Sequence, residues 1–99
     1  MMLSIGICPV CAAGPLGLRQ CGVCRRVVVL CDECDVAWRT DDPTRPGSYG
    51  QETMPCPGCS ADLWTAGATW ATREAVAATP WLVKHLPTLV ESPAREPQR

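Results

Sequence analysis

Residues 21–34 read CGVCRRVVVLCDEC and place two Cys-x-x-Cys pairs at the ends of a six-residue segment, RRVVVL. Residues 27–30, VVVL, are mostly β-branched and form a short apolar run that favours a buried β-strand. Residues 16–20, LGLRQ, alternate apolar and polar side chains in part, which favours a half-buried strand. The sequence therefore predicts a β-hairpin of 16–20 and 27–30, with residues 21–24 in its turn.

The eight cysteines of the chain all fall in pairs with two residues between the thiols. This spacing lets the chain turn so that both sulfurs face one point, and two such turns make a closed tetrahedral thiolate site that suits Zn²⁺. Four pairs with no cysteine left over predict two zinc ions per chain, each held by four cysteines. The predicted ligands are Cys8, Cys11, Cys21, Cys24, Cys31, Cys34, Cys56 and Cys59.

The grouping of the pairs follows from the strand between them. If RRVVVL is extended, it holds Cys24 and Cys31 about 20 Å apart, which disfavours one ion shared by the second and third pairs. Two groupings remain open. In the interleaved one, the first pair joins the third and the second joins the fourth. In the sequential one, the first pair joins the second and the third joins the fourth. The interleaved grouping is slightly favoured, since residues 11–31 suit a zinc-ribbon hairpin.

The chain is too small for a large core. It has 99 residues and no Phe, and ten Pro and eight Gly indicate much irregular backbone. A structural zinc can contribute on the order of 10 kcal/mol to folding, comparable with the stability of a whole domain. The net charge of −1 gives no overall basic field that would draw the chain to nucleic acid or anionic lipid.

The cysteine pairs could also form disulfides, carry out thiol redox catalysis or bind iron. The N-terminal residues MMLSIGICPV lack the basic region of a secretory signal, so we expect a cytoplasmic protein with reduced thiols rather than four disulfides. Thiol redox catalysis needs a Cys-x-x-Cys at a helix N-terminus, and no convincing helix follows these pairs. Iron can occupy such a site in place of zinc. A single Lys, no Asn and much Ala, Arg and Pro fit a GC-rich bacterial genome.

The remaining segments complete the predicted architecture. Residues 1–66 are expected to form the double zinc-binding module, with a polar loop at 40–55, and 91–99 a disordered tail. Residues 67–90 are expected to form a helical extension packed on the module, with Thr72 and Thr79 as N-caps and Pro80 between two short helices. The predicted fold class is a small metal-bound α+β protein. Zinc-ribbon-like hairpins surround two four-cysteine sites, followed by short C-terminal helices.

Cys8-Pro9-Val10-Cys11 and Cys56-Pro57-Gly58-Cys59 resemble the CPxC knuckles of zinc ribbons. They also resemble the first and last ligand pairs of RING-type cross-brace domains, over residues 8–59. A RING domain would imply ubiquitin-ligase work, with Val10 and Trp38 placed to contact the conjugating enzyme. The centre departs from this pattern, because it has no ligand His and its spacing is closer to FYVE domains, whose basic His-containing lipid motif is absent. The resemblance is therefore carried to the fold and not to either activity.

Function is expected to be binding rather than catalysis, because closed thiolate sites leave no position for substrate. Four tryptophans, of which at least one is expected to be exposed, favour a protein–protein interaction module or accessory subunit. The alternative is a nucleic-acid-binding regulator that uses Arg19, Arg25 and Arg26. The single histidine, His85, is not needed as a ligand. The acidic residues are interpreted as a solvated face: Asp32, Glu33, Asp35, Asp41 and Asp42.

Overall fold

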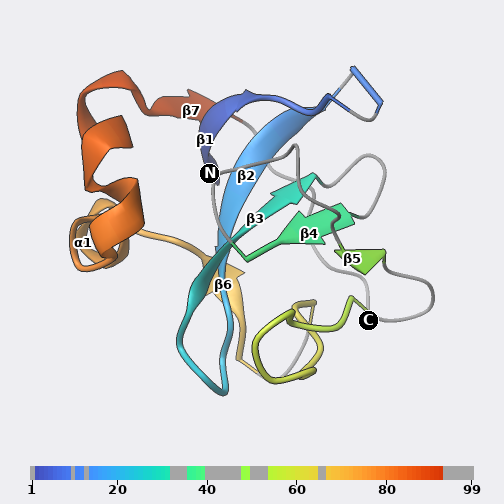
Figure 1. Cartoon of the computed structure of the whole chain (residues 1–99). Coiled ribbons are helices and arrows are strands. Elements are labelled where there is room, and N and C mark those ends of the chain that lie inside the picture. The colour runs from blue at the N-terminus through green and yellow to red at the C-terminus, as the bar shows by residue number, and fades with distance from the viewer. Residues whose placement is uncertain are drawn as a thin grey trace.

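Short antiparallel strands form one sheet in the computed structural model, which describes residues 2–9, 11–12, 14–31, 36–39, 48–49, 54–64 and 67–92. The strand order is β5-β4-β3-β2-β1-β7, and β6 pairs with β2 beside β1 (Figure 1). The elements in chain order are β1 (Met2–Ile7), β2 (Pro15–Gln20), β3 (Val27–Cys31), β4 (Val36–Trp38), β5 (Ser48–Tyr49), β6 (Thr69–Trp70), α1 (Arg73–Ala77), the 3-10 helix η1 (Pro80–Thr88) and β7 (Val90–Ser92).

The predicted hairpin is confirmed. Strands β2 and β3 pair antiparallel from Leu16 opposite Cys31 to Gln20 opposite Val27. The turn that joins them contains the second cysteine pair, as the sequence predicts. The N–H of Cys21 donates to the carbonyl of Arg26 across this turn at 2.9 Å, which closes the hairpin at its tip.

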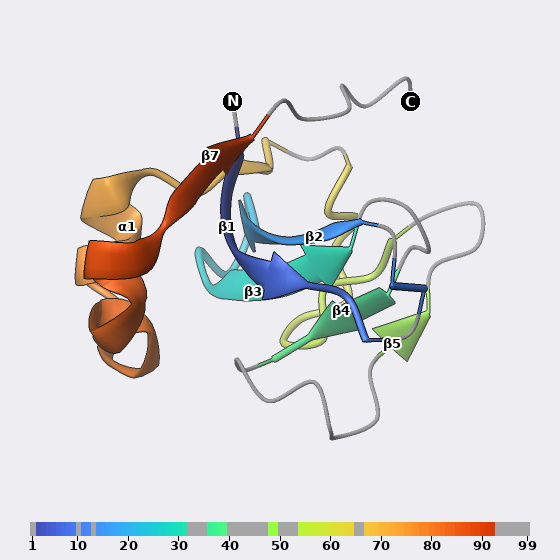
Figure 2. The same cartoon turned by 90° about the horizontal axis from the view of Figure 1, so that it is seen from above.

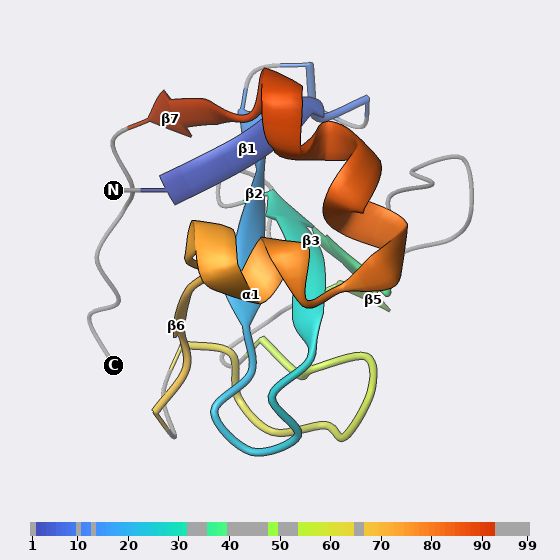
Figure 3. The ribbon, with the colours of Figure 1, turned by 90° about the vertical axis from the view of Figure 1, so that its left-hand side faces the viewer.

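Strand β3 is buried on both faces. Its side chains alternate between two apolar clusters, as the two-residue period of a strand requires. Helices α1 and η1 cover one face of the sheet (Figure 3), and the segment 54–64 covers the other. Members of the first cluster include Val27, Val29, Val76 and Leu82, and members of the second include Val28, Leu30, Met54, Leu63 and Trp64.

Strand β2 has two different neighbours along its second edge. Its first half pairs with β1 and its second half, at Arg19 and Gln20, pairs with β6. The pairing partner of β2 changes from β1 to β6 near Gly17. A Cβ added at Gly17 would collide with the Met2 side chain and lie 3.0 Å from the Trp70 ring. Glycine at this position lets side chains from both neighbouring strands meet over β2.

The C-terminal segment departs from the predicted helical extension. Residues 69–70 form β6 and 90–92 form β7, which pairs with β1 at the edge of the sheet (Figure 2). The strands of this segment are therefore part of the same sheet as the cysteine-rich region. The sequence gives no local signal for these two short strands, because their pairing partners lie far away in the chain. Glu91 and Ser92 lie in β7, inside the range expected to be disordered, and residues 93–99 lie outside the described residues.

The helix boundaries follow local chemistry. The Thr72 hydroxyl accepts from the Ala75 N–H at 3.1 Å, so the predicted N-cap of α1 is confirmed. Pro80 begins η1, which separates the two helices as predicted. Thr79 makes no side-chain cap bond to η1, because its hydroxyl donates to the Ala75 carbonyl of α1 at 2.8 Å. No helix in the described ranges is long and apolar enough to cross a membrane.

The predicted loop at 40–55 contains a short strand and a buried residue. Ser48 and Tyr49 form β5 and pair with β4. Met54 is fully buried in the second apolar cluster, and its N–H donates to the Asp62 side chain at 3.1 Å. The other residues of this range, except Pro55, lie outside the described residues. The surrounding stretch is polar and rich in Pro and Gly, which predicts a loop. This composition conceals the buried Met54 and the two residues of β5.

Arg19 is buried rather than placed to contact phosphate. Only 2% of its surface is exposed, and its guanidinium donates to the carbonyls of Leu63 at 2.8 Å and Ala68 at 3.2 Å. The same group lies 5.1 Å from the Trp64 ring centroid and 4.8 Å from that of Trp70. Two tryptophans and two carbonyls therefore satisfy the buried charge, and the prediction that Arg19 binds nucleic acid is wrong.

We expect Arg19→Met to lower the free energy of unfolding by about 2–4 kcal/mol, because it leaves two carbonyls without their charged donor and removes both ring contacts. Chemical denaturation of the metal-loaded protein measures this loss. Arg25→Met is the matched control, since Arg25 is exposed and should change stability by less than about 0.5 kcal/mol. Equal effects of the two substitutions would contradict the structural role of Arg19.

Candidate metal centres

The described cysteines gather into two groups. In the turn-end cluster, the Sγ atoms of Cys21, Cys24, Cys56 and Cys59 all lie within 4.8 Å of one another. In the open-end cluster, the same holds for Cys8, Cys11 and Cys31. The grouping of these seven residues is the interleaved one, in which the first pair joins the third and the second joins the fourth. Cys34 lies outside the described residues.

The two clusters lie at opposite ends of the β2–β3 hairpin. Cys21 and Cys24 lie in the turn between the strands, whereas Cys31 is the last residue of β3, opposite Leu16 at the start of β2. The strand therefore separates the thiols of the second and third pairs as predicted, although it begins at Val27 and does not include Arg25 and Arg26.

Sulfur–sulfur distances fit a shared ion better than a covalent bond. The Sγ atoms are 3.5 Å apart between Cys21 and Cys59, and 3.7 Å apart between Cys24 and Cys56. In the open-end cluster, Cys11 and Cys31 are 3.6 Å apart. A disulfide needs about 2.05 Å, so these sulfur pairs are thiols rather than disulfides. A tetrahedron with metal–sulfur bonds of about 2.3 Å has edges of about 3.8 Å, so the sulfurs stand close to the spacing of a tetrathiolate site.

The three fully described cysteine pairs share one backbone turn. The residue after each second cysteine has a positive φ: 54° at Ala12, 65° at Arg25 and 69° at Ser60. In the first and last pairs, the N–H of this residue donates to the carbonyl of the first cysteine, at 2.9 Å to Cys8 and 2.8 Å to Cys56. A left-handed conformation is uncommon in residues other than glycine, and its recurrence at one position shows that the three turns share a specific backbone conformation.

Backbone N–H groups of these turns point at the sulfurs. The N–H of Val23 donates to Cys21 Sγ at 3.4 Å, and the N–H of Gly58 donates to Cys56 Sγ at 3.3 Å. Such bonds favour the thiolate, which is the form that binds a metal. The local turn therefore favours the metal-binding form of the first cysteine in each of these two pairs.

The four thiols of the turn-end cluster cannot all ionise without a cation. Burial and the neighbouring Cys59, Cys21 and Cys56 thiols raise the pKa of Cys24 to about 12, and burial raises the pKa of Cys56. Burial also acts to raise the pKa of Cys21, but the N–H groups of Val23 and Cys24 and the neighbouring thiols outweigh it and lower that pKa to about 7. Cys21 therefore becomes a thiolate more readily than Cys24 or Cys56.

Each cluster belongs to a different side of the sheet. Cys8 and Cys31 are buried in the apolar cluster under α1 and η1. Cys21 and Cys56 are buried in the cluster under the segment 54–64. Cys59 is exposed, so the turn-end cluster reaches the surface at one sulfur. The sites extend the two halves of the core instead of standing apart from it.

The arrangement bears on the other predictions for this region. Neither sulfur group includes His85, which lies on η1. Among the described residues, α1 begins at Arg73 and η1 at Pro80, so no described cysteine lies at the helix N-terminus that thioredoxin-type chemistry uses. Val10 and the predicted acidic face, Asp32, Glu33, Asp35, Asp41 and Asp42, lie outside the described residues.

The tryptophans have mainly a core role. Trp38 and Trp64 are each 4% exposed, and Trp70 and Trp81 are half-buried and pack against the two apolar clusters. The prediction of an exposed tryptophan is therefore wrong. In a chain without Phe, the large aromatic side chains are needed to fill the space beside the cysteines.

Comparisons with family models, with curated proteins and with solved structures gave no match for this chain. The description of the site therefore rests on its own geometry.

We expect zinc affinity to rise steeply with pH, because Zn²⁺ must displace protons from thiols whose pKa lies above neutrality. Cys24 and Cys56 are protonated at neutral pH, and Cys21 gains its proton as the pH falls through about 7. Release of at least two protons predicts an affinity change of about 100-fold or more per pH unit between about pH 6 and 7. Competition with a chromophoric chelator, corrected for the chelator's own protonation, measures this slope. A pH-independent affinity would contradict thiol ligation.

Proposed function

We propose that this chain is a small zinc-binding protein in which two structural Zn²⁺ ions stabilise the two ends of the β2–β3 hairpin, and that it acts as a non-catalytic interaction module. The observation that carries the proposal is the turn-end cluster. Four sulfurs from two separate turns lie within 4.8 Å of one another at the spacing of a tetrahedral thiolate site. The Cys8–Cys11 and Cys56–Cys59 knuckles also resemble those of zinc ribbons, which supports zinc as the bound ion.

Zinc is the ion that fits this donor set. Four cysteine sulfurs in tetrahedral arrangement are typical of structural zinc. The turn-end cluster supplies all four from Cys21, Cys24, Cys56 and Cys59. The open-end cluster supplies three, and Cys34 completes it in this proposal. When bound, each ion contributes folding free energy on the order of 10 kcal/mol to a chain with a thin core.

A non-catalytic role follows from the proposed coordination. A site with four protein thiolates leaves no open position at which water or substrate can be activated. The residues of the site then hold the knuckle turns in place and fix the register of the hairpin. Binding is the activity that such a rigid surface supports.

Exposed apolar side chains on the knuckles support a protein partner. Ile7, which precedes the first cysteine pair, is 62% exposed, and Val23, inside the second pair, is 61% exposed. Large aliphatic side chains exposed at the end of β1 and on the turn of the second cysteine pair are suited to partner contacts. The alternative is a nucleic-acid-binding regulator. Of the three arginines predicted to contact nucleic acid, Arg25 and Arg26 are exposed, whereas Arg19 is buried.

Metal content tests the proposal directly. We expect two zinc ions per chain by elemental mass spectrometry of protein purified under reducing conditions. Cys56→Ser should lower the content to about one ion, because it removes a buried ligand of the turn-end cluster only. Ser60→Ala is the matched control beside the same knuckle, and it should retain both ions. A metal-free protein with oxidised thiols would overturn the proposal and revive the redox alternative.

The interaction role has a separate test. A tagged chain expressed in its native host should co-purify with a stoichiometric protein partner, and Val23→Ser should lose that partner while keeping both zinc ions. Thr72→Ser, an exposed position on the opposite region of the fold, serves as the control that retains the partner. A protein that runs alone as a monomer with two zinc ions would contradict the interaction role and leave the zinc assignment standing.

A further inference from the structure

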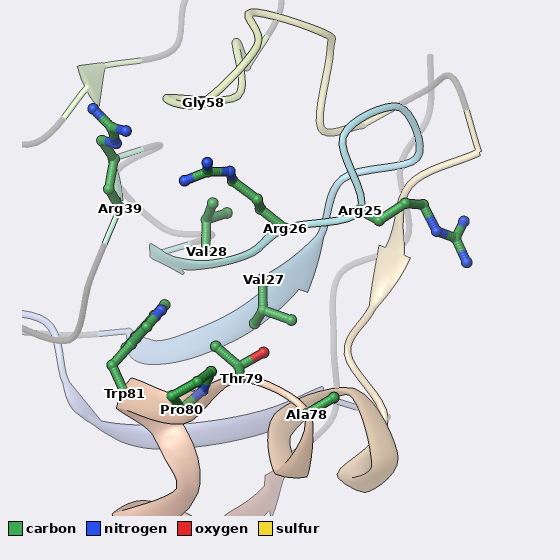
Figure 4. A pocket seen from close by; sticks show the side chains of 10 residues that line it. All are labelled: Arg25, Arg26, Val27, Val28, Arg39, Gly58, Ala78, Thr79, Pro80 and Trp81. Carbon is green, nitrogen blue, oxygen red and sulfur yellow. The ribbon is translucent and has the colours of Figure 1, made fainter.

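A small cavity of about 170 Å³ lies where the hairpin turn meets the start of η1. Residues from four separate segments line it: the first residues of β3 and those before it, the residue after β4, the turn of the last cysteine pair, and residues 78–81 (Figure 4). The cavity is thus formed only by the tertiary structure, between the turn-end knuckle and the helical layer.

The lining is strongly basic. It contains Arg25, Arg26 and Arg39, all exposed, and it contains no carboxylate. Within the described part of the chain, no carboxylate lies in ion-pair distance of these three arginines, and the ion pair seen there joins Arg73 and Glu91. Figure 4 shows the guanidinium groups of Arg26 and Arg39 on one side of the cavity, with Arg26 directed toward Arg39, whereas Arg25 points away.

The Arg26 side chain is held by the neighbouring knuckle. A Cβ added to Gly58 would lie 3.1 Å from Cδ of Arg26 and 3.7 Å from Sγ of Cys24. Glycine at this position therefore lets the Arg26 side chain pack close over the turn of the last cysteine pair. The guanidinium is placed by a rigid turn rather than by a free loop, which lowers the entropy lost when it binds an anion.

The opposite wall is apolar and aromatic. Pro80 and Trp81 line it at the start of η1, and the Val27 side chain is directed toward Thr79 (Figure 4). The Thr79 hydroxyl is already used, since it donates to the Ala75 carbonyl. The cavity therefore has one face for an anion and one for a flat apolar group.

We propose that this cavity binds a phosphate ester carried on a planar aromatic group, with the phosphate at Arg26 and Arg39 and the ring against Trp81. Two guanidinium groups match the charge of a phosphate monoester dianion better than that of a single carboxylate, and each can donate two parallel hydrogen bonds to it. A volume of about 170 Å³ is near the roughly 150 Å³ that holds a benzene-sized ring, so the cavity takes the ring, and the rest of the ligand lies at the exposed guanidinium groups of Arg26 and Arg39. The ligand class is a mononucleotide, either free or as the phosphorylated end of a single strand.

The experiment measures binding to the zinc-loaded protein by calorimetry at low ionic strength. The probes are AMP, adenosine, inorganic phosphate, and a short single-stranded DNA with and without a 5′-phosphate. We expect AMP to bind at least about tenfold more tightly than adenosine or phosphate, since each lacks one of the two contacts. Preference for AMP over the phosphorylated strand identifies a free nucleotide as the source, and the reverse preference identifies a strand end.

The substitutions separate a built site from general positive charge. Arg39→Ala should weaken AMP binding by about 10- to 100-fold, because it removes one side of the phosphate contact. Arg73→Ala is the matched control, since it removes the same charge from an exposed side chain outside the lining of the cavity, and it should change affinity by less than about threefold. Trp81→Leu keeps the apolar wall and should reduce the preference for AMP over inorganic phosphate.

Three results would overturn the proposal: no binding of AMP or of the phosphorylated strand, equal losses in Arg73→Ala and Arg39→Ala, or equal affinity for AMP and inorganic phosphate. The cavity shares the Gly58 turn with the turn-end cluster, so zinc content is measured on the same samples. Two bound zinc ions without AMP binding reject the cavity and leave the proposed function intact. Absence of zinc rejects the proposed function independently of the binding result.

Discussion

The structure depends on a single strand that is buried on both faces. The five side chains of β3 alternate between two apolar clusters, and each cluster continues into one group of cysteines. Cys31 closes the strand on the side of Val27 and Val29, whereas Cys21 and Cys56 join the side of Val28 and Leu30. Core and thiol clusters are thus one continuous structure, and a change in the register of β3 would displace both at once.

A small apolar core covers the second face of the sheet. Without Phe, the layer that covers the second face is built from Met54, Leu63 and Trp64 on an irregular segment. Arg19 joins this segment to β2 through the Leu63 carbonyl and continues to the Ala68 carbonyl beside β6. A buried charge is normally costly, but here charged hydrogen bonds and two indole rings surround it. It fixes a segment that has little regular secondary structure of its own.

The burial of Arg19 also decides how positive charge is distributed over the surface. The remaining arginines near the hairpin turn are exposed, and Arg39 is brought beside Arg26 by the pairing of β3 with β4. The start of η1 then closes the space between them with proline and tryptophan. The cationic cavity and the turn-end cluster share one knuckle, so the geometry of the proposed anion site depends on the turn that positions the thiols.

The sequence by itself determined the local features: the β2–β3 hairpin, the turns at the cysteine pairs, the Thr72 cap and the break at Pro80. Each depends on residues that are neighbours in the chain or are joined by one short turn, where steric preference and backbone hydrogen bonds decide the conformation. The extended strand between the second and third pairs also favoured the interleaved grouping, although the sequential one stayed open. Only the tertiary structure decided that grouping for the seven described cysteines, the recruitment of β6 and β7 into the sheet, the burial of Arg19 and the placement of Arg26 and Arg39 around one cavity. These features join residues far apart in the chain, and short strands or single polar side chains carry no local pattern that reports a distant partner.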